Sequence, residues 1–232
     1  MYSLIFIIII TLPFAFVAYK IVKWAATTEQ KEVTALQHFA QSHGYTFEAQ
    51  PRDKLIDHTI LNISHSYTVR NKISMPDGRC VLTCVEAEEP GGNTYLVCVS
   101  PYAGDKLNFN LAPKLLSVRW DLNSTGLRKY QLEGSLDTIY DFYVLEGSEQ
   151  EALTLLQPDK LLNLIRSSPN SSLAARPGRL YYFYWGGFTE LAEPGSEWNY
   201  ETAFKKVNDV MDMIEGKNTL VGAEAATASP VT

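Results

Sequence analysis

The fold is decided by residues 67–99, whose sequence is YTVRNKISMPDGRCVLTCVEAEEPGGNTYLVCV. Residues of high β-propensity form three short runs, at 67–75, 80–86 and 94–99. Turn-forming residues separate the runs, at 76–78 and again at 88–93. Connections this short join neighbouring antiparallel strands. The stretch therefore predicts a β-meander.

The same alternation of short runs and turns continues on the C-terminal side. A turn at 101–105 leads into an expected strand at 107–111, which would extend the meander beside 94–99. Shorter strands are expected at 128–133 and 142–145. A closing hairpin is expected where 173–175 and 180–185 flank Pro177-Gly178.

Helical spacing marks the regions on either side of these strands. Residues 33–40 form one helix, with a capping box at Thr27 and Gln30 and a C-cap at Gly44. A second capping box at Ser148 and Glu151 begins a short helix ending near Leu156, and Pro158 suits the first turn of the next. The last helix starts near Asn199 and stops at Gly216, with an apolar face made of Phe204, Val207, Met211 and Ile214.

The N-terminal segment predicts a membrane anchor. Residues 4–18 are almost unbroken apolar sequence, and extending the run to Val22 gives about 28 Å of helix, close to the hydrocarbon thickness. Lys20 and Lys23 follow the run and no charge precedes it, which favours a cytoplasmic C-terminal domain. A cleaved signal peptide would carry positive charge before its apolar run. A buried core helix is the other alternative, and the anchor is favoured over both.

The expected fold class is α+β. It comprises an N-terminal transmembrane helix, a mainly antiparallel sheet domain with flanking helices, and a C-terminal helix. The expected divisions are an anchor at 1–23, a globular domain at 24–216 and a disordered tail at 217–232, where periodicity is lost. Whether the anchor helix continues into the helix that ends near Gly44 stays open.

The net charge restricts the kinds of partner that the sequence predicts, and the cysteine count bears on the compartment. The chain carries a net charge of −6; residues 1–23 hold two lysines and no acid, so the remainder carries −8. Phosphate backbones repel such a domain, which excludes nucleic acid as a partner. An odd count of three cysteines fits a reducing compartment, in agreement with a cytoplasmic domain.

No catalytic, cofactor-binding or metal site is predicted. Cys80 and Cys84 would share a face of one strand but lie roughly 13 Å apart, too far to ligate one zinc ion, so these thiols and Cys98 are expected to be buried, reduced and metal-free. Carboxylates near a turn, Glu133, Asp137 and Asp141, are expected to be solvated rather than catalytic. His58 and His65 complete the set of candidates considered for a metal or nucleophile.

The densest aromatic run is 181–185, YYFYW. On a strand, Tyr182 and Tyr184 face one way and Tyr181, Phe183 and Trp185 the other. One face is core. The other is either covered by the last helix, which is favoured, or exposed, in which case Tyr181, Phe183 and Trp185 are a candidate partner surface.

The segment Leu132-Glu133-Gly134 is part of a wider pattern. It is followed by Tyr140 and Tyr143, and then by Leu156, Pro158 and Asp159. With the apolar N-terminus and the helix exit at Gly44-Tyr45, this order resembles a family of uncharacterised bacterial proteins with a single N-terminal membrane anchor and a Leu-Glu-Gly-containing α+β domain. The chain departs from that family at Ser135 and Leu136, where Asp and Phe are usual. The resemblance implies an architecture and no activity.

Two functional hypotheses follow. The first is a membrane-tethered, non-catalytic binding or scaffolding module on the cytoplasmic face of the cell membrane. It would contact the lipid bilayer through residues 4–22 and an unknown protein partner through its domain. The alternative is a membrane-anchored, hydrolase-like enzyme with a dispersed active site. A deep polar pocket lined by carboxylates, His or Cys would favour the enzyme.

Overall fold

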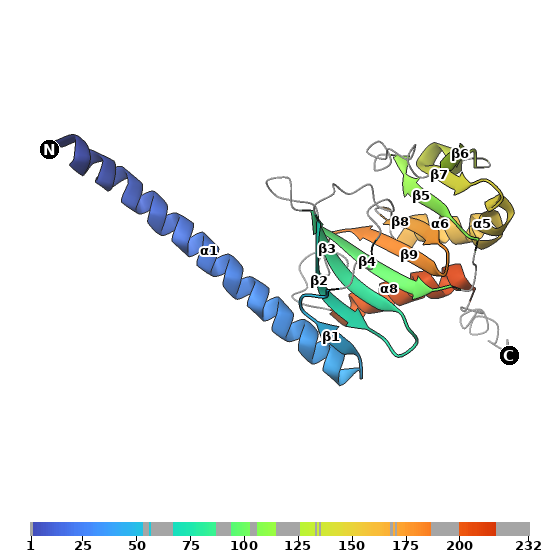
Figure 1. Ribbon diagram of the computed structural model, residues 1–232, viewed down its shortest axis with the longest axis horizontal. Coiled ribbons are helices and arrows are strands. Elements are labelled where there is room, and N and C mark those ends of the chain that lie inside the picture. The colour runs from blue at the N-terminus through green and yellow to red at the C-terminus, as the bar shows by residue number, and fades with distance from the viewer. Residues whose placement is uncertain are drawn as a thin grey trace, which may run out of the picture.

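A computed structural model gives the architecture (Figure 1). It describes residues 2–52, 56, 67–86, 94–102, 106–114, 126–132, 134, 136–167, 169, 171–186 and 200–216. Within these ranges the chain is an antiparallel sheet with flanking helices, so the α+β prediction is confirmed. The predicted tail at 217–232 lies outside the described residues.

The first helix, α1 (Tyr2–Ser42), is 41 residues long and unbroken. It runs through the predicted boundary between residues 23 and 24, so the apolar N-terminus and the helix that ends before Gly44 are one element. The capping box at Thr27 is wrong, because Thr27 lies inside the helix and its Oγ1 donates to the carbonyl of Lys23 at 2.7 Å.

The prediction of a transmembrane anchor is also corrected. Among the residues that the structure describes, no helix combines the length and the apolar character needed to cross a membrane. The helix α1 does not end after Lys20 and Lys23 but continues through a charged stretch that includes Glu29, Lys31 and Glu32. The predicted cytoplasmic orientation depended on that anchor and stays a prediction.

The described strands form one sheet of nine, in the order β1-β2-β3-β4-β9-β8-β5-β7-β6, and all neighbouring pairs are antiparallel. Their bounds are β1 Thr46–Glu48, β2 Tyr67–Ser74, β3 Cys80–Glu86, β4 Thr94–Pro101, β5 Phe109–Pro113, β6 Leu127–Tyr130, β7 Tyr140–Leu145, β8 Ser171–Arg176 and β9 Arg179–Trp185.

The meander is confirmed for β2, β3 and β4 and the hairpin for β8 and β9, but the predicted neighbour of β4 is wrong. β9 pairs with β4, Cys98 opposite Tyr182, while β5 lies between β8 and β7. A short connection permits a hairpin but does not require one. The hairpin of β8 and β9 enters between β4 and β5 and pairs with both.

The remaining described helices are α4 (Leu136–Ile139), α5 (Glu149–Leu155), α6 (Pro158–Ser167) and α8 (Tyr200–Glu215). The helices expected after Ser148, at Pro158 and near Asn199 are thus confirmed. Ser148 is the N-cap residue of α5 as expected, but the capping box predicted with Glu151 is wrong. α5 has no side-chain cap, and the Ser148 hydroxyl donates instead to the carbonyl of Lys106 at 2.6 Å.

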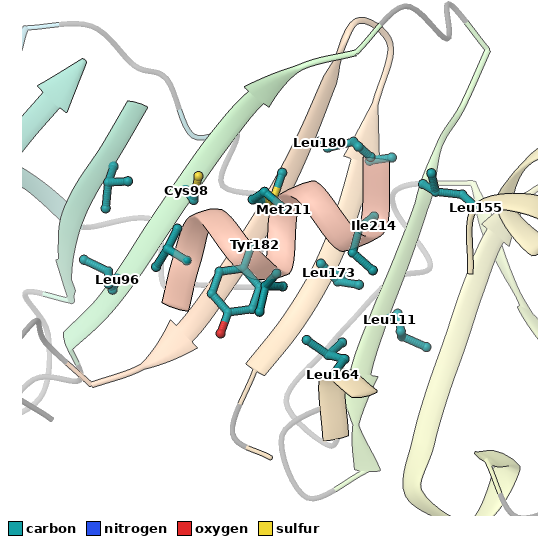
Figure 2. Close-up of a cluster of buried hydrophobic side chains, with 14 of the residues drawn as sticks. Leu96, Cys98, Leu111, Leu155, Leu164, Leu173, Leu180, Tyr182, Met211 and Ile214 are labelled. Carbon is teal, nitrogen blue, oxygen red and sulfur yellow. The ribbon is translucent and has the colours of Figure 1, made fainter. Parts of the chain in front are cut away.

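The sheet separates two apolar clusters, because successive side chains of a strand point to opposite faces. We call the larger one the helix-side core; it holds the buried residues of α8, α6 and α5 together with the end of α1 (Figure 2). We call the smaller one the far-side cluster. It consists of Ile56, Cys80, Leu82, Cys84, Tyr95, Val97, Val99, Ala174, Tyr181 and Phe183.

Candidate functional site

The part of α1 between Phe16 and Trp24 exposes large apolar side chains. Their exposed fractions run from 54% at Val17 to 70% at Trp24. The set consists of Phe16, Val17, Tyr19, Ile21, Val22 and Trp24; we call it the α1 apolar segment. Figure 1 shows α1 extending away from the sheet, which it contacts through its C-terminal part. Contiguous exposed apolar surface of this kind marks an interaction site.

Two lysines interrupt the α1 apolar segment. Lys20 Nζ lies 5.4 Å from the centroid of the Phe16 ring, in a cation–π arrangement, and Lys23 follows one turn later. Both lysines are exposed. The segment therefore offers apolar and positively charged groups together, on a chain whose remaining residues carry a net negative charge.

The C-terminal end of α1 fixes the direction in which the helix projects. Leu36, Phe39 and Ala40 are buried in the helix-side core. The Phe39 ring lies 4.8 Å from that of Phe204 in α8 and 6.3 Å from that of Tyr200. Aromatic pairs at these distances add to the stabilisation that burial provides.

Gly44 ends α1 as predicted. It adopts φ +71°, the left-handed conformation that glycine tolerates without cost. Tyr45 N–H donates to the Ala40 carbonyl at 2.8 Å and Gly44 N–H to that of Gln41 at 3.2 Å, the two bonds of a Schellman motif. Tyr45 then folds back against Phe39, with ring centroids 6.3 Å apart, so the helix exit expected from the sequence is confirmed.

A buried ionic cluster lies at the opposite end of α8. Arg79 donates from Nη2 to Asp212 and, at 3.0 Å, to Oε2 of Glu215. The Arg79 and Glu215 side chains are 5% and 6% exposed. Ser100 of β4 donates its hydroxyl to the other oxygen of Glu215. Asp77 completes the cluster, 3.5 Å from Arg79 Nε. We call these residues the Arg79 cluster.

Sequence reasoning missed the Arg79 cluster, although one local signal was present. The last turn of α8 contains acidic and no basic residues, the reverse of what the helix macrodipole favours. Such a turn needs a cation from elsewhere in the chain. The sequence could have indicated that need, but it could not identify Arg79 as the partner.

The candidate partner surface of the aromatic run is not an exposed patch. Tyr181 and Phe183 are buried in the far-side cluster, and Trp185 is partly buried against it, 5.0 Å from Tyr95 between ring centroids. The last helix packs on the other face, against Tyr182. The favoured prediction, that α8 would cover Tyr181, Phe183 and Trp185, is therefore wrong.

The three cysteines are buried and carry no disulfide, so their predicted burial is confirmed. Cys80 and Cys84 lie in the far-side cluster and Cys98 in the helix-side core. Burial raises the pKa of the Cys80 and Cys98 thiols, which keeps them protonated and unreactive. In the described residues no group of three or more His, Cys, Asp or Glu side chains could hold a metal ion. His58 and His65 lie outside these residues.

Of the carboxylates considered for acid–base work, Asp141 and Asp137 both act on Lys129. Glu133 lies outside the described residues. Asp141 of β7 forms an ion pair with Lys129 of β6 at 2.7 Å, and this contact raises the pKa of the lysine. Asp141 thus joins two neighbouring strands, which is a structural role.

Comparisons with known proteins do not assign the chain to a family. No family model matches it, and no curated protein matches it. Among solved structures it is similar to the mycobacterial trehalose monomycolate transport factor A, TtfA, with a TM-score of 0.48 and 14% sequence identity, over 78% of this chain and 95% of that one. A likeness at this level carries no argument about function. The resemblance to a Leu-Glu-Gly family stays a prediction.

Proposed function

We propose that the chain is a non-catalytic binding or scaffolding module that contacts a protein partner through the α1 apolar segment. One observation supports this most directly, the exposure of six large apolar side chains between Phe16 and Trp24 on a helix that extends away from the sheet. Covering them would remove apolar surface from water, at a gain of roughly 25 cal/mol per Å².

The side chains of the α1 apolar segment lie around the whole circumference of the helix, so a partner would have to enclose it in a deep groove and not cover one face. The helix is continuous from the segment to its buried end at Leu36, Phe39 and Ala40, so little conformational freedom would be lost on binding. Tyr19 and Trp24 are of the residue types that dominate binding energy at interfaces.

The charges of the α1 apolar segment indicate what kind of groove on the partner would bind it. Lys20 and Lys23 lie among the apolar side chains, so the complementary surface is an apolar groove with acidic groups at its rim. A second copy of this chain fits less well. Pairing two α1 helices through this segment would bring the lysines of one copy close to those of the other.

Photo-crosslinking of the full chain tests the proposal. A photo-reactive phenylalanine analogue replaces Tyr19, and the adduct is identified by mass spectrometry and then reproduced with the purified partner. We expect one discrete protein adduct, abolished by Ile21→Gln with Trp24→Gln. The matched control is Ile139→Gln with Leu162→Gln, which alters exposed apolar residues of α4 and α6 and should leave the adduct unchanged.

Three outcomes would contradict the proposal. They are an adduct between two copies of this chain, an adduct that the α1 double variant leaves unchanged, and binding to protein-free lipid vesicles without any protein adduct. The enzyme alternative stays a prediction, for which the described residues offer no supporting cluster.

A further inference from the structure

Different interactions hold the two ends of α8. At the N-terminal end, Tyr200 and Phe204 pack against Phe39 and Tyr45, with ring centroids 4.8–6.3 Å apart. These contacts are apolar and do not depend on charge. At the C-terminal end, Arg79 and Ser100 hold Asp212 and Glu215.

The C-terminal turn of α8 is unfavourable by itself. Asp212 and Glu215 place negative charge where the helix macrodipole is already negative, and the turn contains no basic residue. Lys160 of α6 donates to the Ile214 carbonyl at 3.0 Å, which satisfies one terminal acceptor. Without Arg79 the buried Glu215 carboxylate and the partly buried Asp212 carboxylate would lack their cation, so the turn would be destabilised.

The Arg79 cluster is also unbalanced in charge. Arg79 carries one positive charge, and Asp77, Asp212 and Glu215 carry three negative charges between them. A buried ion pair adds little net stability, whereas loss of one partner is costly because the other charge stays buried. Loss of Arg79 should therefore weaken this contact more than loss of an exposed ion pair would weaken another.

This end of α8 covers a cysteine. Cys98 of β4 and Met211 of α8 are both fully buried in the helix-side core, and Figure 2 shows them in the same cluster as Ile214 and Tyr182. Cys84 is equally buried but lies on the other side of the sheet, in the far-side cluster. The two thiols therefore report on opposite faces of one sheet.

We infer that the C-terminal half of α8, from Val207 to Glu215, is a lid that Arg79 latches over Cys98. The lid opens about the aromatic contacts of Phe204 while the sheet stays folded, and opening exposes the Cys98 thiol to reagents in solution. The thiol stays protonated and inert while it is covered. This inference is independent of the binding role proposed for α1.

Alkylation of the native full chain with iodoacetamide tests the latch, with the rate at each cysteine followed by peptide mass spectrometry. When closing is fast, the rate at a buried thiol follows the population of the open form. We expect Arg79→Met to raise the rate at Cys98 about tenfold or more, since it leaves the buried Glu215 carboxylate without its cation. The rate at Cys84 should stay unchanged.

The matched control is Arg70→Met, which removes an arginine whose ion pair with Glu29 is solvent-exposed. It should alter neither rate. An unchanged Cys98 rate in Arg79→Met, or a parallel rise at Cys84, would overturn the inference, because the first shows no latch and the second shows unfolding of the whole sheet. If Arg79→Met does not fold, Glu215→Gln is judged by the same two rates.

Discussion

Arg79 Nη2 lies 3.0 Å from Oε2 of Glu215, although 136 positions separate the two residues in the chain. The pair joins the residue before β3 to the last residue of α8. Both side chains are almost fully buried, and Asp212 and Ser100 satisfy further polar atoms of the pair. The end of the last helix is thus positioned by the first turn of the meander.

Removal of Arg79 should be costly. We expect Arg79→Ala to lower the free energy of unfolding by about 3–5 kcal/mol, because it leaves the buried Glu215 carboxylate without a cation. Arg70→Ala, which removes an ion pair whose side chains are 45% and 57% exposed, should cost at most about 1 kcal/mol. Urea unfolding measures both values, and equal losses would contradict the burial argument.

The stability of the protein should fall at alkaline pH partly through Tyr140. Burial raises the pKa of this phenol to about 12 from its ordinary value of 10.0. The unfolded chain therefore ionises first, so the stabilisation is complete below pH 10 and is lost as the pH rises to about 12. At roughly 1.4 kcal/mol per pKa unit, the loss is at most about 3 kcal/mol.

Tyr140→Phe separates this effect from general alkaline unfolding. The Tyr140 hydroxyl is buried and has no hydrogen-bond partner among the described residues, so its removal should leave the stability at neutral pH unchanged or slightly higher. We expect urea unfolding of the variant to lose less stability than the parent between pH 10 and 12. Parallel curves for the two proteins would assign the alkaline loss to other groups.

The effect of substitutions at the C-terminal end of α1 on stability should depend on the backbone conformation of Gly44 and not on the room for a side chain. No atom of the described residues lies within 4 Å of a Cβ placed at Gly44, whose φ is +71°. Gly44→Ala should thus cost about 1 kcal/mol through the left-handed conformation alone, and Gly44→Asn less, because Asn tolerates that region. Thermal unfolding of the two variants checks the order, and a larger loss for Asn would refute it.

The far-side cluster should contribute to stability as a core does. We expect Phe183→Ala to cost about 3–5 kcal/mol, the usual range for a buried phenylalanine. Trp185→Ala should cost less, since this ring is only partly buried. Denaturant unfolding compares them. A loss below 1 kcal/mol for Phe183→Ala would restore Phe183 as an exposed contact residue.

The elements that sequence reasoning placed well have local causes. The turn Pro76-Asp77-Gly78 fixes the hairpin of β2 and β3, Pro177-Gly178 that of β8 and β9, and Gly216 the end of α8. The continuity of α1 was left open because two local signals compete at Thr27. A capping box would start a helix there, but the hydroxyl bonds back to Lys23 and the helix continues.

For the candidate sites, too, the sequence predicts what has a local cause and does not predict what depends on packing. The apolar character of residues 16–24 is readable in the sequence, but their exposure is not, because it depends on where the rest of the chain packs. The aromatic run 181–185 was given the correct alternation of faces. Which face the last helix covers could not be predicted, since both faces are apolar enough to form a core.

The sequence by itself determined the short strands, the tight turns, the C-terminal ends of α1 and α8 and the burial of the cysteines, because each follows from propensity or hydrophobicity within a few residues. Only the tertiary structure decided that β9 lies beside β4, that α8 covers Cys98 and Tyr182, and that Arg79 meets Glu215. Those relationships join residues up to 136 positions apart. Their free energy comes from desolvation and packing that exist only once the whole sheet has formed.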